Sequence, residues 1–167
     1  MIDQPRALIL MGVSGSGKTA VGELLSQKLD WPFFDGDDYH PKENVDKMAA
    51  GIPLDDDDRI PWLMNLHDLI ADYLAKGKSV LLACSALKQT YRNLLLEGNP
   101  NTRFIHLKGD FELIMSRMQA RSGHYMKPEM LQSQFATLEE PTDALTVDIR
   151  QNLDRITEEI IIQLHLR

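Results

Sequence analysis

The chain has 167 residues, close to the usual size of one compact domain, and we expect a single domain over residues 1–167. Hydrophobic residues make up 43% and charged residues 26%, values that exclude a mostly disordered chain. The 25 acidic side chains outnumber the 18 basic ones, giving a formal net charge of −7, so non-specific binding to nucleic acid or to an anionic membrane surface is disfavoured.

The sequence favours a cytoplasmic protein. No apolar stretch approaches the roughly 20 residues that cross a bilayer, and the first residues lack the pattern of a secretory signal. Cys84 is the one cysteine and ends the apolar run 80–84, so no disulfide or cysteine-based zinc site can form. We expect Cys84 in the core.

Apolar runs and helical periodicity alternate along the chain. Short apolar runs predict strands at 7–11, 33–34, 80–83, 104–107 and 145–147. Periodicities of three and four predict helices at 18–29, about 41–50, 60–76, 88–97, 110–120 and 150–165. Strands that alternate with helices form parallel βαβ units, so we expect an α/β fold with helices on both faces of a twisted parallel sheet.

A phosphate-binding loop follows the first predicted strand. The pattern G-x-x-x-x-G-K-[ST] is met by Gly12, Val13, Ser14, Gly15, Ser16, Gly17, Lys18 and Thr19. In such a loop, backbone N–H groups and the N-terminus of the next helix bind phosphate oxygens. We expect Lys18 to reach the β- and γ-phosphates of a nucleotide and the Thr19 hydroxyl to bind magnesium. A glycine-rich turn that merely precedes Lys-Thr is the alternative.

P-loops serve switches, motors and small-molecule kinases, so other residues must decide the reaction. The chain has no late N-K-x-D segment that would read guanine, and it is small for a motor.

Carboxylates end the second predicted strand, where ligands bind in parallel α/β sheets. Alternation along the strand points Asp35 and Asp37 the same way, which favours Asp37 over Asp38 as a functional residue. One carboxylate could hold magnesium or its waters, and the other could accept the proton of an attacking hydroxyl. The alternative is a solvated acidic turn.

Cations follow these carboxylates along the chain. The run 55–58 predicts a loop or helix N-cap with Asp58 as the cap, and Arg59 could form a fork with a substrate carboxylate or lie on the surface. After the third strand, Ser85, Lys88 and Arg92 could bind hydroxyls or a carboxylate of the acceptor.

A predicted mobile lid covers residues 117–130. It contains Arg117 and Arg121, followed by His124, and its arginines could neutralise the transferred phosphoryl group and exclude water. Cations that stabilise a helix C-terminus are the alternative.

Together these segments resemble the gluconate kinase (gluconokinase) family of small P-loop kinases, over residues 6–150. The more specific segments are Asp57-Asp-Arg-Ile-Pro-Trp-Leu63 and Cys84-Ser-Ala-Leu-Lys88; others are 12–19, 35–41 and 121–126. The resemblance implies a three-layer P-loop NTPase fold like that of nucleoside monophosphate kinases, with a five-stranded parallel sheet and a lid. It also implies ATP and Mg²⁺ as ligands and a homodimer.

The implied reaction is transfer of the ATP γ-phosphoryl group to the 6-hydroxyl of D-gluconate, giving 6-phospho-D-gluconate and ADP. By analogy with the related shikimate kinases, Asp35 would serve magnesium, Asp37 the reactive hydroxyl and Arg59 the substrate carboxylate. We further expect catalytic roles for Lys18 and Arg121, nucleotide contact by Arg117, and substrate contacts by His40, Lys88, Arg92 and His124. A kinase of the same fold with another acceptor, such as shikimate, and a nucleotide-binding regulator without an acceptor are the alternatives.

Overall fold

The computed structural model describes residues 4–120 and 127–166. Its five strands form one parallel sheet in the order β2-β3-β1-β4-β5. The strands are β1 Ala7–Met11, β2 Phe33–Asp35, β3 Val80–Ala83, β4 Thr102–Lys108 and β5 Leu145–Asp148. The helices are α1 Lys18–Leu29, the 3₁₀ helix η1 Gly36–Tyr39, α2 Lys42–Ala49, α3 Asp56–Ala75, α4 Gln89–Leu96, α5 Phe111–Gln119, α6 Pro128–Thr137 and α7 Leu153–Gln163.

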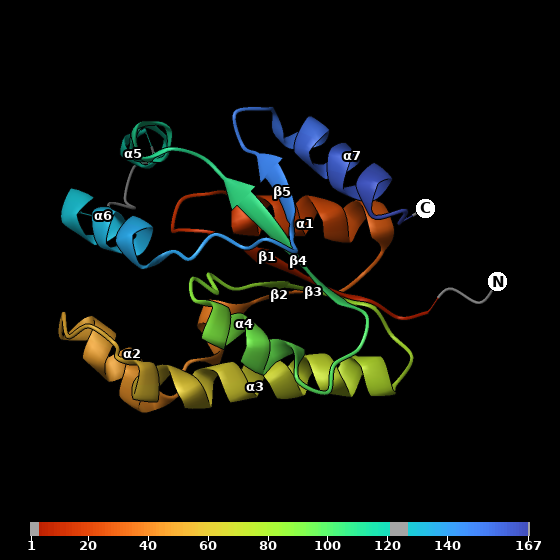
Figure 1. Ribbon diagram of the computed structural model, residues 1–167, viewed down its shortest axis with the longest axis horizontal. Coiled ribbons are helices and arrows are strands. Elements are labelled where there is room, and N and C mark those ends of the chain that lie inside the picture. The colour runs from red at the N-terminus through yellow and green to blue at the C-terminus, as the bar shows by residue number, and fades with distance from the viewer. Residues whose placement is uncertain (1–3, 121–126, 167) are drawn as a thin grey trace.

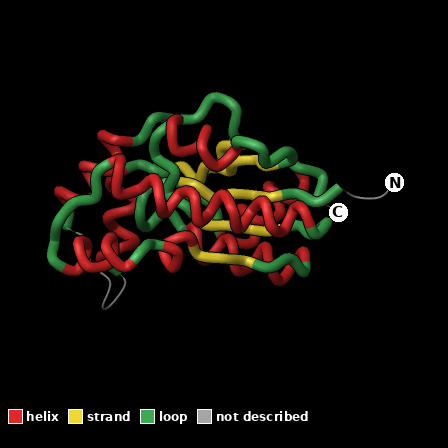
Figure 2. The backbone as a smooth tube through the Cα atoms, turned by 90° about the horizontal axis from the view of Figure 1, so that it is seen from below, coloured by secondary structure: helices red, strands yellow, loops and turns green. Residues whose placement is uncertain are grey.

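Helices cover both faces of the sheet, which gives the three predicted layers. In Figure 1, α2, α3 and α4 lie on one side of the strands, and α1, α5 and α7 lie on the other. Alternate residues of β1 enter the two cores: Leu8 packs with residues of α1 and α7, whereas Ile9 packs with residues of α3 and α4. Because both faces are buried, β1 is apolar throughout. From below, helices pass in front of the strands (Figure 2).

The helix α1 starts inside the phosphate-binding loop. Its N-cap is Gly17, whose φ of 97° is left-handed and whose lack of a side chain leaves the first N–H groups of the helix uncapped. Free N–H groups at a helix N-terminus are a binding site for anions. The fold therefore presents the loop at the carboxyl end of β1.

Three elements differ from the sequence-based expectation. The 3₁₀ helix η1 was not predicted; it contains Asp37, so the expected alternation of Asp35 and Asp37 along a strand is wrong. The helix α3 begins at Asp56, four residues earlier than predicted, and its N-cap is Asp55 rather than Asp58. The Asp55 side chain accepts the Asp58 N–H at 2.7 Å, and the Asp58 side chain accepts the Asp55 N–H at 3.1 Å. This reciprocal capping box places most of the acidic run inside the first turn, where negative charge stabilises a helix. The helix α6 was not predicted.

No helix in the described ranges is long and apolar enough to cross a membrane. Residues 121–126 of the predicted lid, with Arg121 and His124, lie outside the described residues.

Candidate active site at the ends of β1, β2 and β3

The phosphate-binding loop has the local geometry that its glycines permit. A Cβ atom on Gly12 would lie 2.8 Å from Ser16 Oγ and 2.9 Å from the Leu107 carbonyl oxygen, so a larger residue cannot fit. Lys18 Nζ donates hydrogen bonds of 2.9 Å to the carbonyl oxygens of Gly12 and Val13. Ser16 Oγ is buried and has no hydrogen-bond partner in the described part of the chain. Such an unpartnered polar group fits a loop that binds the oxygens of a ligand.

Two opposing influences act on the charge of Lys18. Burial lowers the pKa of its ammonium, and the carboxylates of Asp37 and Asp35 oppose that shift. A lysine in this position can exchange its loop carbonyls for phosphate oxygens, since both are hydrogen-bond acceptors.

Two carboxylates stand beside the loop, but a turn and not strand alternation places the second one: β2 ends at Asp35, and Asp37 lies in η1. Asp35 Oδ2 lies 3.4 Å from Thr19 Oγ1, and Asp35 Oδ1 accepts the Asp37 N–H at 3.0 Å. Partial desolvation raises the pKa of Asp37, the neighbouring Asp35 raises it further, and Lys18 lowers it, although the side chain keeps access to solvent. A carboxyl group with a raised pKa is suited to accept a proton from a hydroxyl.

The Thr19 hydroxyl and the Asp35 carboxylate are hard oxygen ligands of the kind that Mg²⁺ takes. Within the described residues, no group of three or more His, Cys, Asp or Glu side chains could hold a metal ion by itself. Magnesium bound with a nucleotide takes one or two protein oxygens together with phosphate and water. The residues present therefore fit a nucleotide-bound magnesium ion.

His40 follows η1 directly and is its C-cap residue. Its ring stacks on Trp62 with centroids 4.3 Å apart and an interplanar angle of 14°. Trp62 Nε1 donates to the Gly36 carbonyl at 2.7 Å, which fixes the turn that carries Asp37. Burial, and then the charge of Arg59, lower the pKa of His40. The imidazole is thus kept neutral near pH 7. Its Nδ1 accepts from Asn44 Nδ2 at 3.2 Å, which leaves Nε2–H as a donor.

Arg59 and Lys88 converge on one tyrosine. Arg59 Nη1 donates to the Tyr91 hydroxyl at 3.2 Å, and its guanidinium carbon lies 5.7 Å from the ring centroid. Lys88 Nζ lies 5.6 Å from the same centroid and donates to Asp56 Oδ1 at 3.1 Å. The Tyr91 hydroxyl itself donates to Asp56. The structure therefore brings together Arg59 and Lys88, both predicted as substrate contacts. Tyr91 and Asp56, to which the sequence analysis gave no role, connect them.

Arg92 differs from its predicted place among the acceptor contacts. Its side chain is 1% exposed, and its guanidinium donates to the carbonyl oxygens of Ala86 at 2.6 Å and Glu139 at 2.7 Å. The chain itself engages these donors, so Arg92 holds the loop after β3 in place instead of facing an acceptor. Ala86 in that loop has a left-handed φ of 46° and needs such support.

Arg117 lies on the other side of the loop, in the last turn of α5. Its Nη2 donates to the Ile149 carbonyl at 2.5 Å. A cavity of about 270 Å³ joins Arg117 and Met118 to the loop glycines and to the start of α7 at Asn152. Because this cavity adjoins the phosphate loop away from the carboxylates, it is the candidate place for the nucleoside of ATP.

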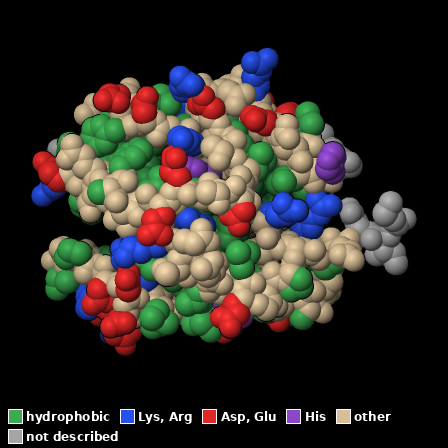
Figure 3. Space-filling view, viewed as in Figure 1, with side chains coloured by type: hydrophobic (Ala, Val, Ile, Leu, Met, Phe, Trp, Pro, Cys, Tyr) green, Lys and Arg blue, Asp and Glu red, His purple; other side chains and the backbone are tan. Residues whose placement is uncertain are grey.

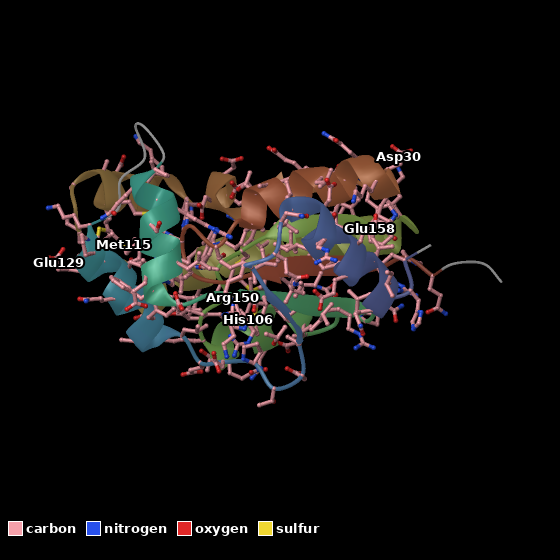
Figure 4. All side chains as sticks on the ribbon, turned by 90° about the horizontal axis from the view of Figure 1, so that it is seen from above. Asp30, His106, Met115, Glu129, Arg150 and Glu158 are labelled. Carbon is pink, nitrogen blue, oxygen red and sulfur yellow. The ribbon has the colours of Figure 1, made fainter. Side chains whose placement is uncertain are left out.

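A larger hollow of about 620 Å³ lies at the ends of β4 and β5. Its lining includes His106 and Arg150, which Figure 4 shows near each other. The rim carries ion pairs, Lys108 with Glu140 at 2.9 Å and Arg150 with Asp148 at 2.7 Å. Figure 3 shows acidic and basic side chains interspersed on this face of the molecule, with no large basic patch there.

Comparisons with known proteins identify the family to which the chain belongs. A sequence profile of the shikimate kinase family matches residues 14–164. The thermoresistant gluconokinase of Escherichia coli is 52% identical over 157 residues, covering 92% of this chain and 90% of that protein. The gluconokinase of Gluconobacter oxydans is 42% identical, covering 95% of this chain and 90% of that protein.

Solved structures give the same result. The crystal structure of a gluconokinase from Sinorhizobium meliloti has a TM-score of 0.87 at 42% identity, covering 96% of this chain and 92% of that chain. A shikimate kinase from Aquifex aeolicus, at 18% identity and a TM-score of 0.57, shares the fold. The predicted P-loop kinase fold is thereby confirmed. With these relatives, this nucleotide loop and the paired carboxylates beside it, the chain belongs to the gluconokinase family and is an ATP-dependent kinase.

Proposed function

We propose that this chain transfers the γ-phosphoryl group of ATP to the 6-hydroxyl of D-gluconate. The observation that carries the proposal is a pair of side-chain groups: Lys18, Asp35 and Asp37 beside the phosphate loop, and Arg59 with Lys88 around Tyr91. The end of β2 at Asp35 pairs with the end of β3 at Ala83, and the loop after β3 leads to Lys88. The first group suits a nucleotide and a reacting hydroxyl. The second suits a carboxylate. A sugar acid offers both functional groups on one small molecule.

The residues at the loop account for the transfer step. Lys18 and the loop N–H groups hold the phosphates of ATP, while Asp37 orients the 6-hydroxyl and accepts its proton. The new bond forms between that oxygen and the γ-phosphorus as the bond to the ADP oxygen breaks. Thr19 and Asp35 would hold magnesium, which when bound offsets the charge of the phosphates.

The acceptor contacts follow from the second group. Arg59 pairs with the carboxylate, and Lys88 and the neutral His40 serve hydroxyl groups. Arg117 contacts the nucleoside. A lid over residues 117–130 is also part of the proposal. In it, Arg121 contacts the transferred phosphoryl group and His124 contacts the sugar acid. A homodimer remains a part of the proposal that rests on the family resemblance, magnesium rests on that resemblance and on Thr19 and Asp35, and a cytoplasmic location rests on the sequence pattern alone.

The test is ADP release from Mg-ATP with D-gluconate, neutral sugars, other sugar acids or shikimate as acceptor. Only D-gluconate should give rapid release. The Asp37→Asn variant should lose about 10²–10⁴-fold in kcat, the usual contribution of a positioned base, while ATP binding measured by calorimetry stays within about twofold. Asp38→Asn, an adjacent exposed acid, is the matched control and should keep its activity. Unchanged turnover in Asp37→Asn, or release that another acceptor supports better, contradicts the proposal.

A further inference from the structure

A side chain from α6 reaches the phosphate-binding loop. Gln134 Oε1 accepts the backbone N–H of Ser14 at 2.7 Å, and Gln134 Nε2 donates to Ser14 Oγ at 3.0 Å. The two residues are 120 positions apart in the sequence. Ser14 is the third residue of the loop, so this pair of hydrogen bonds connects α6 directly to the segment that surrounds the phosphates.

The chemistry of the pair fixes the direction of each hydrogen bond. A backbone N–H can only donate, so the oxygen of the Gln134 amide must face it and the NH₂ group must face the serine. The NH₂ group can only donate, so Ser14 Oγ is an acceptor in this bond. A hydroxyl has one hydrogen, and that hydrogen is consequently directed away from Gln134 and left available to another acceptor.

The helix that carries Gln134 is anchored on both sides of it. Leu131 is fully buried and shares a core cluster with Val13, the second residue of the loop. Phe135 packs edge-on against Phe111 of α5, with centroids 6.1 Å apart. These contacts fix the height and rotation of α6, so the amide of Gln134 meets the loop in one position.

The segment after α6 is tied to the acceptor side of the site. The Glu139 N–H donates to the Leu87 carbonyl at 2.8 Å, and a Glu139 carboxylate oxygen accepts the Gln89 N–H at 2.8 Å. Leu87 and Gln89 flank Lys88. The segment from Gln134 to Glu139 therefore bridges the nucleotide loop and the loop that carries a proposed acceptor contact.

We propose that Gln134 is a positioning residue for phosphoryl transfer. It holds the phosphate loop at Ser14 and turns the Ser14 hydroxyl hydrogen toward the phosphates of the nucleotide. The inference rests on the proposed function only in that the loop binds ATP, and it does not depend on the identity of the acceptor.

The decisive variant is Gln134→Glu. Its carboxylate still accepts the Ser14 N–H, so the temperature of unfolding should stay within about 2 °C of the wild type. A carboxylate cannot donate, so it captures the Ser14 hydroxyl hydrogen instead, and it adds negative charge beside the phosphates. We expect kcat/KM for ATP to fall at least tenfold, with KM for the acceptor changed less than twofold. The matched control is Gln132→Glu, which adds the same charge at an exposed position of the same helix and should leave both constants unchanged.

A double-mutant cycle tests the route through the serine. Gln134→Ala and Ser14→Ala should each weaken ATP binding severalfold in calorimetry, and the double variant should be no weaker than Gln134→Ala alone. A Gln134→Glu enzyme with wild-type kcat/KM for ATP would overturn the inference, as would fully additive losses in the cycle. Because ATP binding is measured without an acceptor, these outcomes are distinct from a failure of the D-gluconate assignment.

Discussion

Replacing Arg59 with alanine should weaken the binding of D-gluconate and leave the binding of ATP almost unchanged. Arg59 is half-buried in the second turn of α3, and the Tyr91 hydroxyl fixes its guanidinium at 3.2 Å. A hydrogen bond to a charged group contributes about 1.5–3 kcal/mol, which corresponds to roughly a 10- to 150-fold change in affinity. We therefore expect KM for D-gluconate to rise by that factor in Arg59→Ala. KM for ATP should stay within about twofold, because the nucleotide loop belongs to a different part of the site.

A milder change at Tyr91 tests the same role of Arg59. Tyr91→Phe removes the hydroxyl that fixes Arg59 but keeps the ring beneath the two cations. Because Arg59 itself is kept and only its position becomes less fixed, KM for D-gluconate should rise less than in Arg59→Ala, by about 2- to 12-fold. In the Arg59→Ala background the same change should have almost no further effect, since the group that the hydroxyl positions is gone.

The assay is coupled detection of ADP at saturating levels of one substrate while the other is varied. Arg103→Ala, a change at an exposed arginine of β4, is the control for a general loss of positive charge. Equal increases of both KM values in Arg59→Ala would refute the carboxylate role, because they would indicate damage to the site as a whole. A lone fall in kcat would refute it as well.

Three further predictions concern the scaffold. Burial raises the pKa of the Cys84 thiol to about 12, so the folded protein should resist iodoacetamide at pH 8 and react only when denatured, as mass spectrometry would show. A Cβ on Gly22 would lie 2.2 Å from Phe33 Cε2. Although alanine has the better helix propensity, Gly22→Ala should therefore lower the free energy of unfolding, measured by urea titration, by up to about 2 kcal/mol. Adding Phe33→Leu to Gly22→Ala should restore most of the lost stability. Burial lowers the pKa of His106 below its ordinary value of 6.5, so as the pH drops this histidine takes up a proton in the unfolded chain before it does so in the folded protein. The free energy of unfolding should therefore fall below about pH 6.5. Urea titrations of His106→Gln should show a smaller loss of stability between about pH 7.5 and 5.5 than those of the wild type.

The strands and the phosphate loop could be predicted because their signals are local. The residues of β1 and β3 are apolar without interruption, since both faces of the sheet are covered, and the loop motif has fixed spacings. The helix α6 has a weak signal by comparison. In its ten residues only Leu131 is fully buried, and Gln134, one turn further along, makes a polar contact with the phosphate-binding loop. A short helix with one fully buried side chain shows little hydrophobic periodicity.

Arg92 shows a second limit of sequence reasoning. Arginine is rarely buried, so one that follows a strand end is reasonably expected to face a ligand. Its acceptors are the carbonyl oxygens of Ala86 and Glu139, and the latter is 47 positions away. Backbone carbonyls carry no residue identity, so no pattern in the sequence marks them as partners. Tyr91 and Asp56 were missed for a related reason, since their roles arise only where α3 meets α4.

The charges of the acceptor cluster bear on which acids the site can hold. Arg59 and Lys88 are balanced in part by Asp56, which leaves one net positive charge around Tyr91. That charge matches the single carboxylate of a monocarboxylic sugar acid. At the reacting end of the site, desolvation and the neighbouring Asp35 carboxylate already raise the pKa of Asp37. A second negative charge on the substrate there would therefore be unfavourable. A second carboxylate at the far end of the acid would meet repulsion there, whereas a hydroxyl would find an acceptor for its proton. An acidic chain can thus bind two anionic substrates and still select an acid with one carboxylate and a terminal hydroxyl.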